Sequence, residues 1–191
     1  MPQKTDLAAK MQTFAELIEG RVVDDHTRVE VCLKGTVLGF PATLEAIGAG
    51  WPFGVNYFIE TKVIDDPNEP ENPMSLKLTL LPRVARGFMQ IFARVLLIEA
   101  RGQSIGDKRL EKEFILSFNN SEEAHRFAQY PGVYERLLDL HNYSKFSELL
   151  IKSNSGLWLA QPVNFRSLHA DVCKETFKTM AEIGQILFES F

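Results

Sequence analysis

The residues best suited to bind a ligand are four arginines on or beside one apolar segment: Arg83, Arg86, Arg94 and Arg101. A guanidinium group is planar, permanently charged, and able to donate paired hydrogen bonds to a carboxylate or a phosphate. Four such groups close together repel one another unless anions neutralise them. The spacing therefore indicates a site for an anionic small molecule or an acidic protein partner. We nevertheless rank a simpler interpretation first: the arginines pair with Asp107, Glu111 and Glu113 or are solvated.

A second candidate is the glycine-rich loop from Gly48 to Gly54, which contains Trp51 and Phe53. A phosphate-binding loop needs a strand before it and the start of a helix after it. Here a strand is expected to follow, and no Lys-Ser or Lys-Thr pair closes the loop. We therefore expect a turn in which Trp51 and Phe53 pack on the sheet edge. If these two rings are exposed, they mark a binding surface.

No pattern indicates a metal, a cofactor or a catalytic centre. None of the four histidines has the spacing of zinc ligands: His26, His125, His141 and His169. The carboxylates of Asp65–Glu71 lack the regular oxygen spacing and central glycine of a calcium loop. The chain has no Gly-x-Ser-x-Gly motif, and neither Cys32 nor Cys173 belongs to a Cys-x-x-Cys pair. We therefore expect no cofactor, and we favour a protein without enzymatic activity.

The apolar segment after Arg83 must position the arginines. If residues 83–99 form a helix, three arginines and Gln90 lie on one side of it. The apolar residues then form one stripe on the other side: Val84, Phe88, Ile91, Phe92, Val95 and Leu96. Read as a strand, the alternation fails at Ile91-Phe92-Ala93 and again at Leu96-Leu97-Ile98. We therefore favour the helix, and we expect this segment to be central to the core.

The remaining chain divides into short strands and amphipathic helices. Helices are expected over 5–19, 43–47, 120–129, from 131 onward and over 168–190, where Phe188 shares the apolar stripe. Strands are expected over 22–40, 55–64, 74–81 and 113–118, with a hairpin of 146–151 and 157–162. The proline-rich, acidic segment 65–73 is expected to be an exposed loop.

This order predicts an α+β fold. Its mainly antiparallel sheet is covered by amphipathic helices at both termini and between strand groups. We expect a single domain over 1–191, whose only sub-division would be a mainly β lobe, 1–82, and a helix-rich lobe, 83–191.

Composition and charge exclude several classes of protein. The chain has 191 residues, 45% of them hydrophobic and 24% charged, which fits a globular domain. Its net charge of −4 argues against non-specific nucleic-acid binding, which requires a basic surface. Charges in residues 1–19 exclude a signal-peptide core, and no apolar run is long enough for a membrane span. We therefore expect a cytoplasmic protein, with both cysteines buried as small hydrophobic residues.

From about residue 104 to its end, the chain resembles the C-terminal parts of a group of uncharacterised bacterial proteins. The shared features are Gly106-Asp107, a hydrophobic residue at Leu110, and Phe114 opening a strand. A capped helix after Asn120, a helix containing Leu137-Leu138, a hairpin and a closing amphipathic helix follow. The group usually has Phe-Asp where this chain has Leu110-Glu111, and many members carry upstream membrane segments. The resemblance implies a recurring structural unit and no known activity.

Taken together, the sequence favours a non-catalytic binding or protein-interaction module. Self-association is one expectation, with Phe188 and Phe191 at a homodimer interface. The alternative is an enzyme or small-molecule carrier whose apolar pocket is assembled by the fold. That pocket would be lined by aromatic residues of Val84–Ile98 and Trp51–Tyr57.

Overall fold

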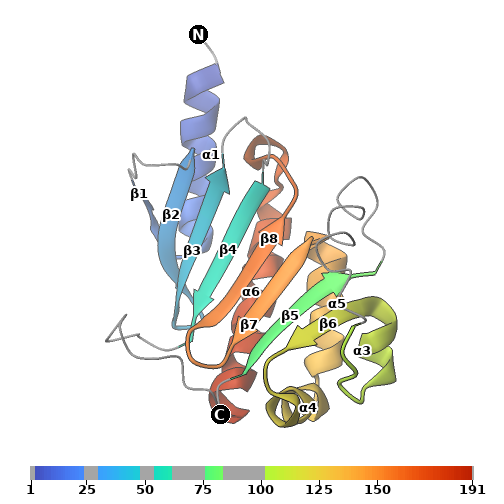
Figure 1. Cartoon of the computed structure of the whole chain (residues 1–191). Helices are drawn as coiled ribbons and strands as arrows, with labels where there is room; N and C mark the ends of the chain where they lie inside the picture. Colours follow the sequence, from blue (N-terminus) through green and yellow to red (C-terminus); the bar gives the residue numbers. More distant parts are fainter. Residues whose placement is uncertain (1–2, 24–29, 48–53, 62–75, 84–101, 191) are drawn as a thin grey trace.

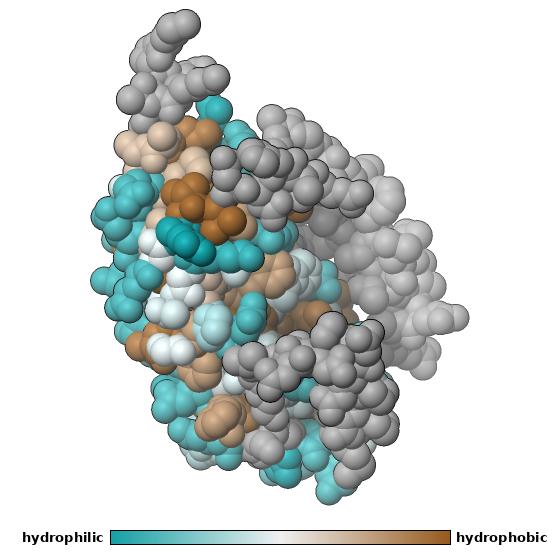
Figure 2. All heavy atoms as spheres, turned by 90° about the vertical axis from the view of Figure 1, so that its left-hand side faces the viewer, coloured by the Kyte–Doolittle hydropathy of each residue, from teal (hydrophilic) through white to brown (hydrophobic). Residues whose placement is uncertain are grey.

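The computed structural model describes residues 3–23, 30–47, 54–61, 76–83 and 102–190. These residues form one eight-stranded sheet in the order β1-β2-β3-β4-β8-β7-β5-β6, and every neighbouring pair is antiparallel. The prediction of an α+β fold with an antiparallel sheet is therefore confirmed. Helices α1, α5 and α6 lie on one side of the sheet, whereas α3 and α4 lie near its β6 end (Figure 1). On the β1 side of the molecule, hydrophilic residues are mixed with hydrophobic ones (Figure 2).

The elements of the first half are α1 (Gln3–Leu17), β1 (Arg21–Val23), β2 (Val31–Val37), β3 (Phe40–Ile47), β4 (Gly54–Glu60) and β5 (Lys77–Pro82). Those of the second half are α3 (Lys108–Glu113), β6 (Phe114–Phe118), α4 (Ser121–Gln129), α5 (Val133–Ser144), β7 (Glu148–Lys152), β8 (Gly156–Gln161), the 3-10 turn η1 (Phe165–Ser167) and α6 (Ala170–Ser190). Strands from the two halves are neighbours in the sheet, because β8 pairs with β4 and β5 lies between β7 and β6.

The core lies between the helices and one face of the sheet. In β4, Val55, Tyr57 and Ile59 are buried, while the residues between them remain partly exposed, as expected for a strand with one buried face. The Tyr57 ring meets Phe177 of α6 edge-on, with 5.0 Å between the ring centroids. Both cysteines are free and buried, as predicted.

Several local predictions are confirmed. Helix α4 begins at the predicted cap, where the Asn120 side-chain oxygen accepts hydrogen bonds from the backbone N–H groups of Glu122 and Glu123. The hairpin of β7 and β8 and the C-terminal helix α6 also form where they were expected. Asp107–Glu113, to which the sequence assigned no element, contains the short helix α3.

Two predictions for the first half are wrong. Residues 43–47, expected to be helical, belong to strand β3, because Ala42, Leu44 and Ala46 alternate with more exposed residues and pair with strands on both sides. The strand expected over 22–40 is interrupted by a two-residue turn at Leu38-Gly39, after which β3 begins. The predicted helix after Arg83, the loop with Trp51 and Phe53 and the acidic loop 65–73 lie outside the described residues.

Candidate functional site

Of the six residues predicted from the sequence to bind a ligand, only Arg83 belongs to the described part of the chain. It follows β5, where its Nε donates to the carbonyl oxygen of Glu111 at 2.7 Å and its backbone N–H donates to the carbonyl oxygen of Glu113 at 2.9 Å. Arg83 therefore connects the end of β5 to α3. The structure does not describe Arg86, Arg94, Arg101, Trp51 or Phe53, so the anion site stays a prediction.

The carboxylates near Arg83 are held by other groups. The Glu111 carboxylate accepts from the Ser104 hydroxyl at 2.8 Å and from the backbone N–H groups of Ile105 and Gly106 at 2.9 and 3.0 Å. These hydrogen bonds, the Ser104 one foremost, lower the pKa of Glu111. Asp107 accepts from Arg109, which lowers the pKa of Asp107. These carboxylates therefore stabilise the turn into α3.

A polar hollow of about 580 Å³ lies beside this turn, between α3, the end of α4 and the start of α5. Its most prominent cation, Arg109, lies over the Tyr134 ring, 4.3 Å from the centroid. The same guanidinium contacts Asp107 at 2.9 Å and Glu135 at 3.4 Å. Because these carboxylates already neutralise Arg109, it offers little to an anionic ligand.

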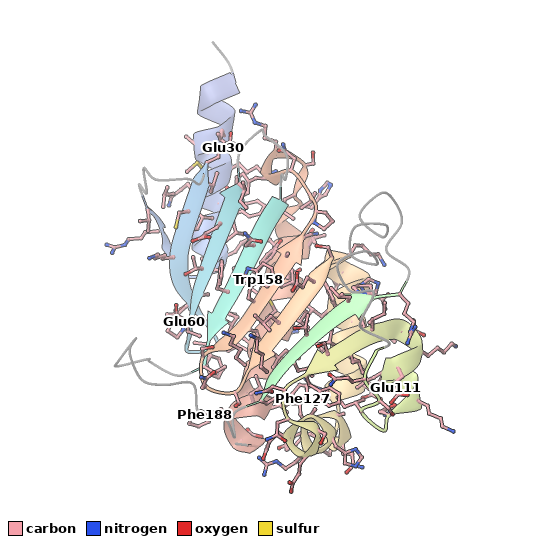
Figure 3. The ribbon with its side chains drawn as sticks, in the orientation of Figure 1. Glu30, Glu60, Glu111, Phe127, Trp158 and Phe188 are labelled. Atoms are coloured by element: carbon pink, nitrogen blue, oxygen red, sulfur yellow. The ribbon has the colours of Figure 1, made fainter. Side chains whose placement is uncertain are left out.

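A second hollow, of about 370 Å³, is mainly apolar. It lies where the β2–β3 turn, the end of β4 and the end of α6 meet. We call it the hairpin hollow, and it is lined by Leu38, Gly39, Phe40, Pro41, Glu60, Thr61 and Phe188. In Figure 3, Glu60 and Phe188 mark its place at the lower end of the sheet.

Leu38 reaches this hollow from a strained turn. Val37 and Phe40 are paired across the hairpin, so Leu38 and Gly39 form a two-residue connection, with φ values of +51° and +85°. Positive φ at both positions defines a turn that favours asparagine or glycine, because a leucine Cβ is crowded there. The Leu38 side chain is nevertheless 61% exposed. The fold therefore tolerates both backbone strain and an exposed leucine at this position.

Phe188 reaches the hollow from the last turns of α6. The prediction that it shares the buried face of this helix is wrong, since Phe188 is 63% exposed whereas Leu187 is buried. The reason is that α6 continues beyond the lower end of the strands, so the sheet no longer covers its last turns (Figure 1). Its exposure leaves a large aromatic ring beside Leu38.

Two polar residues of the hairpin hollow, Glu60 and Thr61, have no side-chain partner among the described residues. Glu60 is exposed, and no described cation lies within ion-pair distance of its carboxylate. The Thr61 hydroxyl is buried and has no hydrogen-bond partner in the part of the chain that the structure describes. A buried hydroxyl without a partner costs about 1–3 kcal/mol. The hollow thus combines exposed apolar side chains with a carboxylate and a hydroxyl for which the described residues provide no partner.

The sequence did not indicate this site. A Leu-Gly pair between two β-branched stretches was the one local signal, and leucine is an unusual residue for such a turn. Phe188 was expected on the apolar stripe of the C-terminal helix and, with Phe191, at a homodimer interface, but nothing in the sequence placed it beside Leu38. The contact between residues so distant in sequence depends on β2, β3 and β4 being neighbours in the sheet and on α6 ending beside them.

Other chemistry has little support among the described residues. Within them, no three His, Cys, Asp or Glu side chains are grouped so that they could hold a metal ion. Burial raises the pKa of the Cys173 thiol well above its ordinary value, which disfavours the reactive thiolate. Desolvation lowers the pKa of His141, whose ring packs against Phe114 and Phe146 in the core. These groups therefore behave as packing residues.

Comparison with known proteins adds no assignment. No protein family matches the chain, and neither the curated proteins nor the solved structures include a significant match. Among the described helices, none is long and apolar enough to cross a membrane.

Proposed function

We propose that this chain is a non-catalytic interaction module that forms a homodimer through the hairpin hollow. One observation carries the proposal: Leu38 and Phe188, the most exposed large hydrophobic side chains of the described residues, line the same hollow. Each copy thereby presents projecting apolar groups and a recess on one surface. A two-fold contact requires such a self-complementary surface, because the same patch is used by both partners.

The expected strength follows from the area that association removes from water. Full burial of a leucine or phenylalanine side chain contributes about 1.5–3 kcal/mol. Leu38 and Phe188 still expose 61% and 63% of their surface, so each has more than half of this contribution left to gain. Four such side chains per dimer must offset the cost of association. We therefore expect a weak dimer, with a dissociation constant in the micromolar range or above.

A substitution of Glu60 distinguishes homodimerisation from the binding of a basic partner protein. In a two-fold contact through the hairpin hollow, both copies bring their Glu60 carboxylates into one interface, and like charges repel. Glu60→Gln should therefore tighten the homodimer. If the hollow instead receives an apolar side chain next to a lysine or arginine of another protein, the same substitution removes an attractive charge and leaves self-association unchanged.

The test is the molar mass of the protein in solution, measured by light scattering and sedimentation over a wide range of concentrations. The wild type should approach twice the monomer mass as concentration rises. Phe188→Ser should raise the dissociation constant at least about tenfold, which corresponds to a loss of about 1.4 kcal/mol. Ile47→Asn is the matched control, because Ile47 is also an exposed hydrophobic residue but lies at the other end of β3. A wild type that stays monomeric throughout would contradict the proposal.

The alternative, an enzyme or a carrier of a small apolar molecule, is favoured by the unpaired Thr61 hydroxyl. A medium-chain alcohol could place its alkyl chain in the hairpin hollow and its hydroxyl near Thr61. Addition of 1-octanol to a monomeric wild type should then raise the unfolding temperature, and Phe188→Ser should abolish this shift. In either case we expect the protein in the cytoplasm, in keeping with its two free thiols.

A further inference from the structure

The central strands also present a face that no described helix covers (Figure 1). Helices α1 and α6 pack on the opposite face, where Tyr57, Leu149 and Leu159 are buried. The side chains that alternate with these buried ones are partly exposed, and they come from β4, β8 and β7: Asn56, Phe58, Trp158, Ala160, Glu148 and Leu150. Figure 3 places Trp158 in the middle of this face.

The strand register places the small side chain of Ala160 between two longer ones on this face. Asn56 of β4 and Glu148 of β7 are both directly opposite Ala160 of β8. Neighbouring strands are about 4.8 Å apart, so the backbones that carry Asn56 and Glu148 are separated by about 10 Å. The methyl group of Ala160 forms the floor between these longer side chains. Trp158 follows on the same face of β8, about 7 Å along the strand. We call this the Ala160 recess.

The polar groups around the recess have no side-chain partner within the described segments. None of the described residues donates a hydrogen bond to the Glu148 carboxylate or forms an ion pair with it, although Glu148 is partly buried. Desolvation by burial raises the pKa of Glu148, as expected for a carboxylate without a counter-charge. Asn56 likewise has no side-chain partner among the described residues, and Glu45 lies opposite Asn56 on β3. The recess therefore offers acceptors and negative charge beside an indole ring.

We infer that the Ala160 recess binds an arginine side chain of a protein partner. A guanidinium group can donate paired hydrogen bonds to Glu148 and can stack on Trp158. Its remaining N–H groups can donate to the side-chain oxygen of Asn56. A free small molecule is the less suitable occupant, because small-molecule sites are concave pockets that enclose most of the ligand. An arginine on an extended peptide gains additional contact from the flat sheet around the recess.

The test uses the intrinsic fluorescence of Trp158. The chain has two tryptophans, so Trp51→Phe leaves Trp158 as the only reporter. The probes are the capped peptide Gly-Arg-Gly, its citrulline analogue, which has nearly the same shape without the charge, and methylguanidinium. We expect a saturable change with the arginine peptide and at least about tenfold weaker binding of the citrulline peptide and of methylguanidinium. In the same background, Glu148→Gln should weaken arginine binding at least about fivefold.

Glu16→Gln is the matched control, because it removes an exposed carboxylate on α1, which packs on the opposite face of the sheet and outside the hairpin hollow. It should leave the affinity for the arginine peptide unchanged. Equal binding of the arginine and citrulline peptides, or an unchanged affinity in Glu148→Gln, would overturn the inference. Methylguanidinium that binds as tightly as the peptide would overturn the assignment to a protein partner. Because none of these outcomes depends on dimerisation, the inference and the proposed function can fail separately.

Discussion

The substitution Leu38→Asn should affect folding and association in opposite directions. Leu38 occupies the first central position of the β2–β3 turn, with φ at +51°, and its side chain is 61% exposed. A residue with a branched, bulky side chain loses about 1–2 kcal/mol in this left-handed region, whereas asparagine tolerates it. The removed side chain contributes little to the core. We therefore expect the monomer to gain about 1 kcal/mol in free energy of unfolding.

The same substitution removes an apolar side chain from the hairpin hollow. If the hollow is the dimer interface, the homodimer should dissociate at concentrations where the wild type remains paired. Urea unfolding at low protein concentration, where both variants are monomeric, measures the gain in stability without a contribution from association. Sedimentation at high concentration measures the loss of dimer. For a domain of this size the gain corresponds to roughly 2–4 °C in unfolding temperature.

Ile47→Asn provides the comparison for both measurements. Ile47 is 41% exposed and lies at the other end of β3, outside the hairpin hollow and with an ordinary backbone conformation. Its substitution should neither stabilise the monomer nor weaken the dimer. An unchanged or lower stability of Leu38→Asn, with the same urea dependence as the wild type, would refute the strain argument. An unchanged dimer would refute the role of the hollow.

Three further predictions concern the scaffold. Gly156→Ala should prevent folding, as judged by circular dichroism, because a Cβ at this position, where φ is +125°, would overlap the carbonyl oxygen of Ile59. Asn120→Ala should lower the free energy of urea unfolding by about 1 kcal/mol, since it removes the cap of α4. Glu111→Gln should destabilise the protein more at pH 7 than at pH 3. The folded-state pKa of Glu111 is lowered, so its contribution is present above the unfolded pKa of about 4.3 and is lost as the pH falls through the folded value. Urea unfolding of both proteins at the two pH values measures this difference.

The elements that could be predicted are those with a local signal. The Asn120 cap satisfies the first N–H groups of α4 with its own side chain, so three residues are sufficient to locate that helix end. The hairpin of β7 and β8 was recognisable because a polar turn ending in Gly156 separates two short apolar runs. Helix α6 has a stripe of apolar residues that is long enough to define its buried face. The stripe fails to predict burial only in the last turns, which the sheet no longer covers.

The failed predictions involve competing periods or contacts between distant segments. Over residues 43–47, Thr43, Leu44 and Ile47 satisfy a helical spacing, but the smaller Ala42 and Ala46 continue the alternation of a strand. Pairing with β2 and β4 on both sides decides between the two, and that pairing is not a local property. For the same reason the position of β8 between β4 and β7 could not be read from the order of elements along the chain.

The charge of the candidate surfaces differs from the sequence-based expectation. The arginines favoured an anionic ligand, and the only described one, Arg83, donates to a backbone carbonyl of α3. At the hairpin hollow and the Ala160 recess, the charged groups are the carboxylates of Glu60 and Glu148, which have no described partner. A surface of this kind attracts cations, and the net charge of −4 acts in the same direction. Because both surfaces belong to the sheet that includes β4, a basic partner held at the recess would lie on the same scaffold as the dimer contact. Weakening of arginine binding by Glu148→Gln and tightening of the dimer by Glu60→Gln would together show that each carboxylate serves a different surface.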